Sequence, residues 1–310
     1  MRCLVLGAGG FVGRQLCHDL LAAGYQVIGF DRQACPLPPV ANLRWQQGDF
    51  RDSQSLVPLV ADVDAVLHLI SATLPQTSND NPLFDLQANV ASTLGLLDGL
   101  WRLPRPPRLL FLSSGGTVYG VPRTLPISED HPTEPLCAYG IGKRAIEQYL
   151  ALYRHLHGLD YLVLRLANPY GPGQPAGRGQ GVIPVFLRRA LAAEALEIWG
   201  DGSVVRDYFY IDDLSRAIVA ALHYSGPHRI FNIGSGSACS LNRLVEQIGQ
   251  LLQRELRPTY LPGRPCDVPV NVLDIRRARH ELGWMPQIDL AEGLRRTLCW
   301  LQATDTVSGP

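Results

Sequence analysis

The chain has 310 residues, of which 46% are apolar and 18% are charged, and its formal net charge is zero. This composition is typical of a globular protein with a substantial core. The charge balance argues against a general polyanion binder, so no nucleic-acid partner is expected. No apolar run approaches the roughly 20 residues that cross a bilayer. The first strand-like run begins almost at Met1, so we expect neither a membrane span nor a signal peptide.

The first strand-like run leads directly into a glycine-rich turn and then into a helix-like stretch. Gly7, Gly10 and Gly13 stand three residues apart, a spacing that lets backbone approach a pyrophosphate at a helix N-terminus. Asp31 ends the next strand, where a carboxylate accepts hydrogen bonds from ribose hydroxyls and repels a 2′-phosphate. Together these features predict an NAD site rather than an NADP site. An ordinary helix-capping turn is the alternative.

Strand-like and helix-like stretches alternate through the first half, which predicts a parallel sheet with helices on both faces. The expected strands are Cys3–Leu6, Gln26–Phe30, Leu43–Gln47, Ala65–Leu69, Arg108–Leu112 and Tyr161–Leu166. The expected helices are Val12–Ala22, Ser53–Leu59, Leu83–Trp101 and Ala138–Leu156. Ligands bind outside the carboxyl ends of such strands, so functional residues should follow each strand.

The second half has a different texture. Residues 168–181 are rich in glycine and proline and are interpreted as a long functional loop. Helices are then expected at Val182–Ala193, Asp212–Leu222, Leu241–Arg254, Ile275–Leu282 and Leu290–Leu301, with strands at Leu196–Trp199, Val205–Ile211 and Ile230–Ile233. Seven scattered cysteines without a C-x-x-C pair favour a cytoplasmic protein with reduced thiols. No H-E-x-x-H motif is present, so no metal site is expected.

Tyr139 and Lys143 stand four residues apart at the start of an expected helix, so they share one face. A nearby cation lowers the pKa of a phenol, and the positive nicotinamide of bound NAD would add to this effect. Such a tyrosine can take the proton of a sugar hydroxyl while hydride leaves for the cofactor. A surface pair on an amphipathic helix is the alternative for this motif alone.

The ordered motifs extend over nearly the whole chain and resemble those of extended short-chain dehydrogenases/reductases, in the sugar-nucleotide epimerase/dehydratase group. Within that group the UDP-galactose (UDP-glucose) 4-epimerases are the most similar type. Besides the residues above, the motifs are Gly48-Asp49, His68-Leu69, Asn89-Val90, Ser113-Ser114, Val118-Tyr119-Gly120, Asn168-Pro169-Tyr170-Gly171-Pro172, Arg206-Asp207-Tyr208, Asp212-Asp213, and Arg264 with Asp267.

The resemblance implies a Rossmann-type doubly wound sheet over residues 1–167, to which 205–235 returns, and a smaller mixed α/β substrate lobe over 168–310. It implies further cofactor contacts from Phe11, Val12, Arg32, Asp49, Phe50, Leu69, Ile70, Ser71, Asn89 and Ser113. It implies substrate contacts from Asn168, Val182, Trp199, Arg206, Arg264, Asp267 and Asn271. Asp49 would hold the adenine amino group, and two arginines, Arg206 and Arg264, would clamp the diphosphate. The alternative interpretations are that Asp49 is a turn residue, that the two arginines are surface charges, and that Trp199 belongs to the core.

The chain departs from the family pattern at several positions. Gly115 stands where a serine or threonine hydrogen-bonds the reacting oxygen, and we expect Thr117, or else Ser114, to supply the hydroxyl. The Asp-Glu pair that serves dehydratases just before V-Y-G is absent, which argues against 4,6-dehydration. Asn271 replaces a tyrosine that crowds the sugar C2 substituent, which predicts room for an N-acetyl group. Thr73 replaces a lysine, which predicts looser cofactor retention.

The expected function is therefore NAD-dependent inversion at C4 of a UDP-sugar through a transient 4-keto intermediate. The expected substrates are UDP-glucose and UDP-galactose or the N-acetylhexosamine pair. A 4-keto reductase, a decarboxylase, a dehydratase, or a non-catalytic NAD-binding protein are the alternatives. By the same resemblance, a homodimer is expected to form through helices such as Leu83–Trp101 and Ala138–Leu156.

Overall fold

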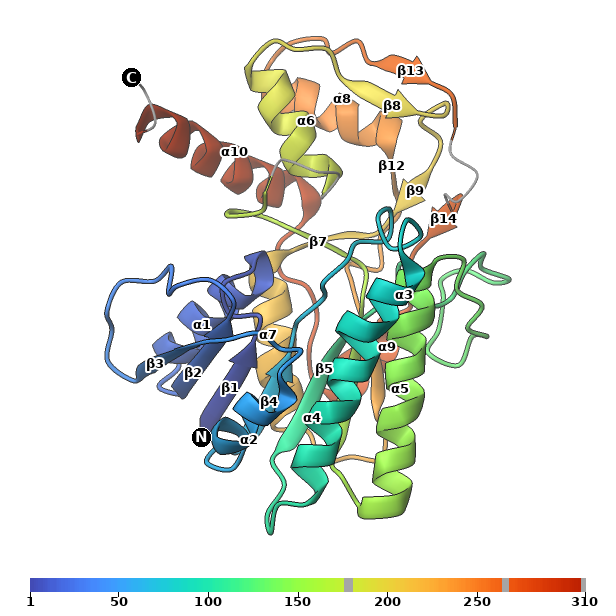
Figure 1. Ribbon diagram of the computed structural model, residues 1–310. Helices are drawn as coiled ribbons and strands as arrows, with labels where there is room; N and C mark the ends of the chain where they lie inside the picture. Colours follow the sequence, from blue (N-terminus) through green and yellow to red (C-terminus); the bar gives the residue numbers. More distant parts are fainter. Residues whose placement is uncertain (176–180, 264–267, 308–310) are drawn as a thin grey trace.

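The structure is a computed structural model that describes residues 1–175, 181–263 and 268–307. Within these residues, seven parallel strands form one sheet in the order β11-β6-β5-β4-β1-β2-β3, with helices on both faces (Figure 1). The strands are β1 (Arg2–Leu6), β2 (Gln26–Asp31), β3 (Leu43–Gln47), β4 (Ala65–His68), β5 (Arg108–Ser114), β6 (Tyr161–Leu166) and β11 (Ile230–Ile233). The expected Rossmann-type parallel sheet is confirmed.

Alternate residues of each strand serve two separate hydrophobic layers, because successive side chains point to opposite faces of a sheet. In β1, Cys3 and Val5 pack with helices α1 and α7, whereas Leu4 and Leu6 pack with α2, α4 and α5. Both faces are therefore covered, which explains why the central strands are continuous apolar runs. The helices around the sheet are α1 (Phe11–Ala22), α2 (Val57–Val60), α4 (Ser92–Trp101), α5 (Ala138–His157), α7 (Ile211–Leu222) and α9 (Arg276–Glu281).

A smaller lobe lies beyond the carboxyl ends of the strands, at the top of Figure 1. Its helices are α6 (Val182–Leu191) and α8 (Leu241–Leu251), and the terminal helix α10 (Leu290–Val307) contacts both of them. Short strand pairs complete this region: β7 (Asn168–Tyr170) with β10 (Tyr208–Tyr210), β8 (Glu197–Trp199) with β13 (Thr259–Leu261), and β9 (Val205–Arg206) between β12 (Cys239–Ser240) and β14 (Val270–Asn271).

Two expected helices differ from the structure in their hydrogen-bond pattern, and the strand expected over Val205–Ile211 is divided into β9 and β10, which belong to different sheets. The helix expected over Leu83–Trp101 consists of three parts, namely α3 (Pro82–Asp85), a π-helix η2 (Leu86–Ala91) and α4. The element expected at Ser53–Leu59 begins as a short 3₁₀ turn, η1 (Ser53–Leu56), before α2. The apolar periodicity identifies the buried helical face of both stretches, but it does not reveal the change in hydrogen-bond pattern within them. The loop expected over 168–181 begins with β7. None of the described helices is both long and apolar enough to span a membrane.

Candidate functional site

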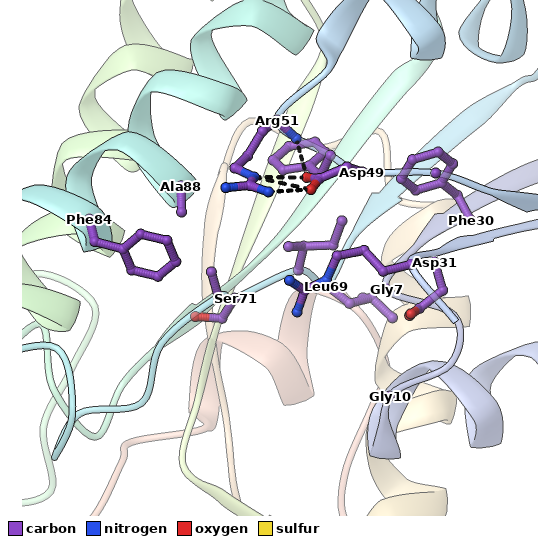
Figure 2. Close-up of a pocket in the computed structure, with 15 residues that line it drawn as sticks. Gly7, Gly10, Phe30, Asp31, Asp49, Arg51, Leu69, Ser71, Phe84 and Ala88 are labelled. Carbon is purple, nitrogen blue, oxygen red and sulfur yellow. Dashed lines mark hydrogen bonds and ion pairs between the residues drawn. The ribbon is translucent and has the colours of Figure 1, made fainter. Parts of the chain in front are cut away.

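Two neighbouring cavities lie at the carboxyl ends of the sheet strands. The first is lined by the glycine turn, by residues that follow β2, β3 and β4, and by Phe84 and Ala88 from the opposite side (Figure 2). The second has a volume of about 790 Å³ and is bounded by the glycine turn, α5 and the smaller lobe. This volume is within the range of sites that hold small organic ligands. Gly7, Gly10, Leu69 and Ser71 line both cavities, so the two are continuous.

The glycine turn is built so that backbone comes close to whatever occupies these cavities. Gly7 has φ +89°, a left-handed conformation that favours glycine. A Cβ at Gly13 would collide with the carbonyl oxygen of Gly7 and lie 2.7 Å from the Ala8 Cα. Gly10, the N-cap residue of α1, has no side chain with which to cap the helix. The N–H groups of the first helical turn can therefore serve an anion such as a pyrophosphate.

Two carboxylates follow strands β2 and β3 at the first cavity. Asp31 accepts hydrogen bonds from the backbone N–H of Gly9 (2.9 Å) and Gln33 (3.1 Å), which ties the end of β2 to the glycine turn. Asp49 accepts hydrogen bonds from Arg51, whose guanidinium and backbone N–H lower the pKa of Asp49 to about 2 (Figure 2). Both carboxylates therefore lie where the sequence predicts adenosine contacts. Arg32, Phe50 and Ile70 line the same cavity.

Lys143 lies on the second cavity and is the only lysine among the 28 basic residues of the chain. Lys143 is 5% exposed, and its ammonium donates a hydrogen bond to the Leu112 carbonyl (2.9 Å) and lies 5.6 Å from the centre of the Tyr139 ring. Burial lowers the pKa of Lys143 to about 8, against the opposing effects of the carboxylates of Asp85 and Glu147. The expected Tyr139/Lys143 arrangement on one helical face is therefore present at the cavity wall.

The phenol of Tyr139 differs from the expectation in one respect. Burial raises its pKa to about 12, whereas a hydrogen bond with Ser71 acts in the opposite direction. The expectation of a lowered pKa for Tyr139 is therefore wrong. Desolvation disfavours the charged form of both groups, and it outweighs the attraction between them. Tyr139 is therefore a neutral phenol at pH 7 in this structure.

The start of α5 is held by a segment that the sequence motifs do not include. Ser78 Oγ accepts a hydrogen bond from the backbone N–H of Tyr139 (3.0 Å), and Asn79 Oδ1 accepts one from Ala138 (2.9 Å). Serine and asparagine are preferred helix caps, but they normally precede the helix that they cap. Here they belong to the loop after β4, and only the tertiary structure brings them to α5.

The loop after β5 reverses the expected order of the two candidate hydroxyls. Ser114 lines the second cavity beside Tyr139 and Lys143, whereas Thr117 is not among its lining residues and packs against Gly140. A Cβ at Gly115 would lie 2.6 Å from the Leu273 side chain. Leu273 thus occupies the space that a serine or threonine at 115 would need, which explains why glycine stands there.

Asn271 lies behind this loop rather than in the cavity. It is 1% exposed, and its amide donates a hydrogen bond to the Gly115 carbonyl (3.0 Å). It is not among the lining residues, so the interpretation of Asn271 as a direct substrate contact is corrected. Strand β14 pairs with β9, and this pairing draws Asn271 under the β5 loop. Asn89 is corrected in the same way, because its side chain is buried and holds the backbone of Ala72 (2.8 Å).

Further predicted residues from both the cofactor side and the substrate side gather at the second cavity. Its lining residues include Phe11, Val12, Ser113, Asn168, Val182, Trp199 and Arg206. The Arg206 guanidinium donates hydrogen bonds to the carbonyls of Val205 (2.9 Å) and Val268 (2.7 Å). These bonds anchor it at the junction of β9 and β14. Arg264 and Asp267 lie outside the described residues.

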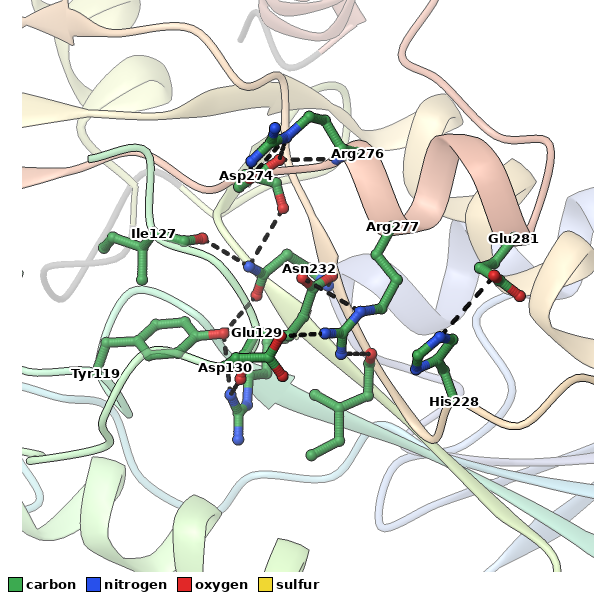
Figure 3. Close-up of polar contacts among 12 residues, drawn as sticks. Tyr119, Ile127, Glu129, Asp130, His228, Asn232, Asp274, Arg276, Arg277 and Glu281 are labelled. Atoms are coloured by element: carbon green, nitrogen blue, oxygen red, sulfur yellow. Dashed lines mark hydrogen bonds and ion pairs between the residues drawn. The ribbon is translucent and has the colours of Figure 1, made fainter. Parts of the chain in front are cut away.

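Tyr119, the tyrosine of the V-Y-G motif, belongs to a buried hydrogen-bond network outside the cavity lining. Tyr119 donates a hydrogen bond to Asn232 in β11 (2.7 Å), and Asn232 in turn donates to the carbonyl of Ile127 (2.8 Å), as Figure 3 shows. Arg165 donates to the Tyr119 hydroxyl (2.9 Å) from β6. Fully satisfied buried polar networks of this kind rigidify their surroundings. This one joins the loop after β5 to the far edge of the sheet, behind the cavity.

Comparisons with known proteins agree with this geometry. Residues 3–234 match the model of the NAD dependent epimerase/dehydratase family. The UDP-glucose 4-epimerase of Mycolicibacterium smegmatis is 38% identical over 307 residues, covering 96% of this chain and 97% of that protein. The UDP-glucuronate 4-epimerase of Thermodesulfobacterium geofontis is 31% identical, with 96% and 95% covered.

Solved structures give the same result. The UDP-glucose 4-epimerase of Thermotoga maritima with UDP-glucose superimposes with a TM-score of 0.92 at 32% identity, covering 98% of this chain and 99% of that chain. The UDP-glucose 4-epimerase of Thermus thermophilus in complex with NAD gives a TM-score of 0.89 at 28% identity, with 97% and 99% covered. The predicted fold, the predicted enzyme class and NAD as the cofactor are thereby confirmed. The chain belongs to the NAD dependent epimerase/dehydratase family.

Proposed function

We propose that the protein inverts the configuration at C4 of a UDP-sugar through a transient 4-keto sugar. The observation that carries this proposal is the meeting of Tyr139, Lys143 and Ser114 at one cavity that is continuous with the glycine turn. Relatives and solved neighbours named for UDP-glucose, UDP-glucuronate and UDP-N-acetylglucosamine 4-epimerases support the reaction and leave the sugar open. Among these substrates we propose UDP-glucose and UDP-galactose or their N-acetylated counterparts.

Each of the residues at these two cavities has a distinct role in this proposal. The glycine turn, Asp31 and Asp49 hold NAD, which supplies a reversible hydride acceptor when bound. Tyr139 Oη takes the proton of the sugar 4-hydroxyl and later returns it. Lys143 stabilises the phenolate electrostatically, and Ser114 Oγ donates a hydrogen bond to the reacting oxygen. Arg206 binds the diphosphate, which a guanidinium fork suits well.

The same proposal assigns the two parts of the chain. Residues 1–167 provide the cofactor side, and the segment 205–235 returns to it through α7 and through β11, which pairs with β6 at the edge of the central sheet. The first strand of this segment, β9, pairs within the smaller lobe and carries Arg206 to the substrate. The remaining residues after 168 form the lobe that holds the nucleotide of the substrate. Strong contacts to the nucleotide and few contacts to the sugar would let the keto sugar rotate about its diphosphate linkage within the cavity. Both faces of C4 would then become accessible to the hydride.

The function is tested by incubating the purified protein and NAD with UDP-galactose, and by following the products by NMR. We expect UDP-glucose at equilibrium without net consumption of cofactor. Stoichiometric oxidation of NAD(P)H would instead identify a reductase, and loss of water would identify a dehydratase. Loss of carbon dioxide from UDP-glucuronate would identify a decarboxylase. No turnover of any UDP-, dTDP-, GDP- or CDP-sugar would contradict the proposal and favour a non-catalytic NAD-binding protein.

Ser114→Ala tests which hydroxyl assists Tyr139. We expect a kcat about 10- to 100-fold lower, the range for a lost hydrogen bond to a group that carries developing charge. Thr117→Val, a change of similar size in the same loop, should leave kcat within about twofold. Initial rates with UDP-galactose measure both variants. A full kcat in Ser114→Ala would contradict the role, whether or not Thr117→Val is impaired.

The proposed partner is a second copy of the chain, because α5 has an exposed apolar face. Ile141, Tyr149, Leu152 and Leu156 are exposed and fall within one face of this helix. The wild type is expected to be a dimer by light scattering, and the double variant Leu152→Arg/Leu156→Arg a monomer. Val40→Arg, which changes an exposed apolar residue far from α5, should remain dimeric. A dimeric double variant would contradict this interface. A cytoplasmic location stays a prediction.

A further inference from the structure

A buried carboxylate that no sequence motif includes lies beside the proposed catalytic pair. Asp85 ends α3, immediately before the π-helix η2, and is 2% exposed. Its Oδ1 accepts hydrogen bonds from the Thr73 hydroxyl and from the Asn89 amide (3.0 Å). Its Oδ2 lies 3.1 Å from the position of a Cβ on Gly142, the residue before Lys143 in α5. The carboxylate is therefore packed directly against the helical turn that carries the lysine.

Asp85 makes no direct ion pair among the residues that the structure describes. Glu147, the other acid near Lys143, differs in this respect because Arg165 donates to both of its oxygens (3.0 and 2.6 Å). Burial of an unpaired charge is costly, so a nearby positive group stabilises a buried carboxylate. The buried Lys143 directly follows Gly142, against which Asp85 packs, so its ammonium is the positive group placed to serve this role. In agreement with this placement, Asp85 is the first of the two carboxylates that raise the pKa of Lys143 against its burial.

The same carboxylate organises the turn beneath the Tyr139 phenol. Asn89, which bonds Asp85 through its amide nitrogen, uses its oxygen to accept the N–H of Ala72 (2.8 Å). Ser71 donates to the carbonyl of Thr73 (3.1 Å), and its hydroxyl also interacts with the Tyr139 phenol. A change at Asp85 therefore reaches both members of the pair, the ammonium through its charge and the phenol through the turn.

We propose that Asp85 is a positioning residue of the Tyr139/Lys143 pair: it anchors the Ser71–Thr73 turn under the phenol and supplies the buried counter-charge of Lys143. The inference rests on the proposed function for its role in turnover, but the charge pairing can be measured without turnover. Other titratable groups also face the pair, namely Glu147 on α5, His68 on β4 and Cys137 before α5. The test must therefore change Asp85 alone.

The single lysine makes a direct measurement possible. Protein labelled with ¹³Cε-lysine gives one lysine signal, whose shift against pH reports the pKa of Lys143. In the wild type we expect the pKa near the value of about 8 set by burial. Asp85→Asn keeps the Oδ1 acceptor and removes only the charge, so the pKa should fall by about one unit or more. Asp80→Asn removes an exposed charge five residues earlier and should leave the pKa unchanged.

The kinetic readout has the same sign. If the ammonium form is required, the alkaline limb of kcat/KM moves to lower pH in Asp85→Asn, whereas a merely structural defect lowers the whole profile without moving the limb. An unchanged Lys143 titration in a folded Asp85→Asn protein overturns the inference. A wild type that titrates as expected but turns over no UDP-sugar contradicts the proposed function instead, and the charge pairing stands.

A second variant covers the case in which Asp85→Asn does not fold. Neutral partners at both positions remove the mismatch of charge, so Asp85→Asn/Lys143→Met should regain a cooperative thermal transition that the single variant lacks. Failure of the double variant to fold, where Lys143→Met alone folds normally, would show that Asp85 is needed for another reason and would overturn the counter-charge role.

Discussion

Tyr139→Phe is expected to lower kcat for C4 inversion by about 10²- to 10⁴-fold, the usual contribution of a positioned general acid–base group. The phenol lies on the cavity wall beside Lys143 and Ser114, and the variant removes only the oxygen that would exchange a proton with the sugar. NAD binding and thermal stability should change little, because the ring remains packed. NMR of reactions with UDP-galactose that are stopped at set times measures kcat. Calorimetric NAD titration measures cofactor binding, and thermal unfolding measures stability.

Tyr149→Phe provides a matched control on the same helix. Tyr149 is 37% exposed and lies on the outer face of α5, away from the cavity. Phenylalanine keeps the ring that the proposed dimer contact would use, so loss of the hydroxyl should leave kcat within about twofold. A Tyr139→Phe enzyme that keeps more than a tenth of the wild-type kcat would show that another group carries the proton. Ser71, which interacts with the phenol, would then be the next candidate to replace.

The direction in which burial shifts the two pKa values explains why the Tyr139 phenol needs a nearby positive charge to lose its proton. Burial raises the pKa of Tyr139 to about 12 and lowers that of Lys143 to about 8, because the neutral form of each group is favoured away from water. At pH 7 the pair therefore rests as a neutral phenol beside an ammonium. Proton transfer to and from the sugar then depends on added positive charge near the phenol, which is why the role of Tyr139 is tested with NAD present.

Gly13→Ala is expected to abolish NAD binding and to destabilise the protein by at least about 1–3 kcal/mol, the range for overpacking a close contact. The new methyl group would collide with the Gly7 carbonyl oxygen and lie 2.7 Å from the Ala8 Cα, and both atoms are backbone that cannot rotate away. The turn would have to open, and the helix N-terminus would move from the cavity. Thermal unfolding and calorimetric NAD titration measure the two effects.

Gly99→Ala is the control for this substitution. Gly99 lies within α4, and a Cβ there would meet only the Val57 side chain at 3.4 Å, an ordinary contact distance. Alanine is also the better helix former, so we expect an unchanged or slightly raised melting temperature and normal NAD affinity. Retention of NAD binding by Gly13→Ala would contradict the close approach of backbone and cofactor at this turn.

The amino-acid sequence by itself determined the features that depend on near neighbours in the chain. The glycine spacing at Gly7–Gly13, the carboxylate at Asp31 and the pairing of Tyr139 with Lys143 on one helical face all follow from local geometry. The strand-like runs are equally local, and three of them, Leu43–Gln47, Tyr161–Leu166 and Ile230–Ile233, coincide with β3, β6 and β11. Strand and helix periods therefore place the cofactor turn and the acid–base pair without knowledge of the fold.

Only the tertiary structure decided which distant groups reach that pair, because burial and hydrogen bonding depend on segments far apart in the chain. Leu273 fills the space beside Gly115, so Ser114 rather than Thr117 lies at the cavity. Ser78 caps α5 from another loop, and Asp85 packs against the turn that carries Lys143. The raised pKa of Tyr139 has the same origin, since desolvation is a property of the packed interior and leaves no pattern in the sequence.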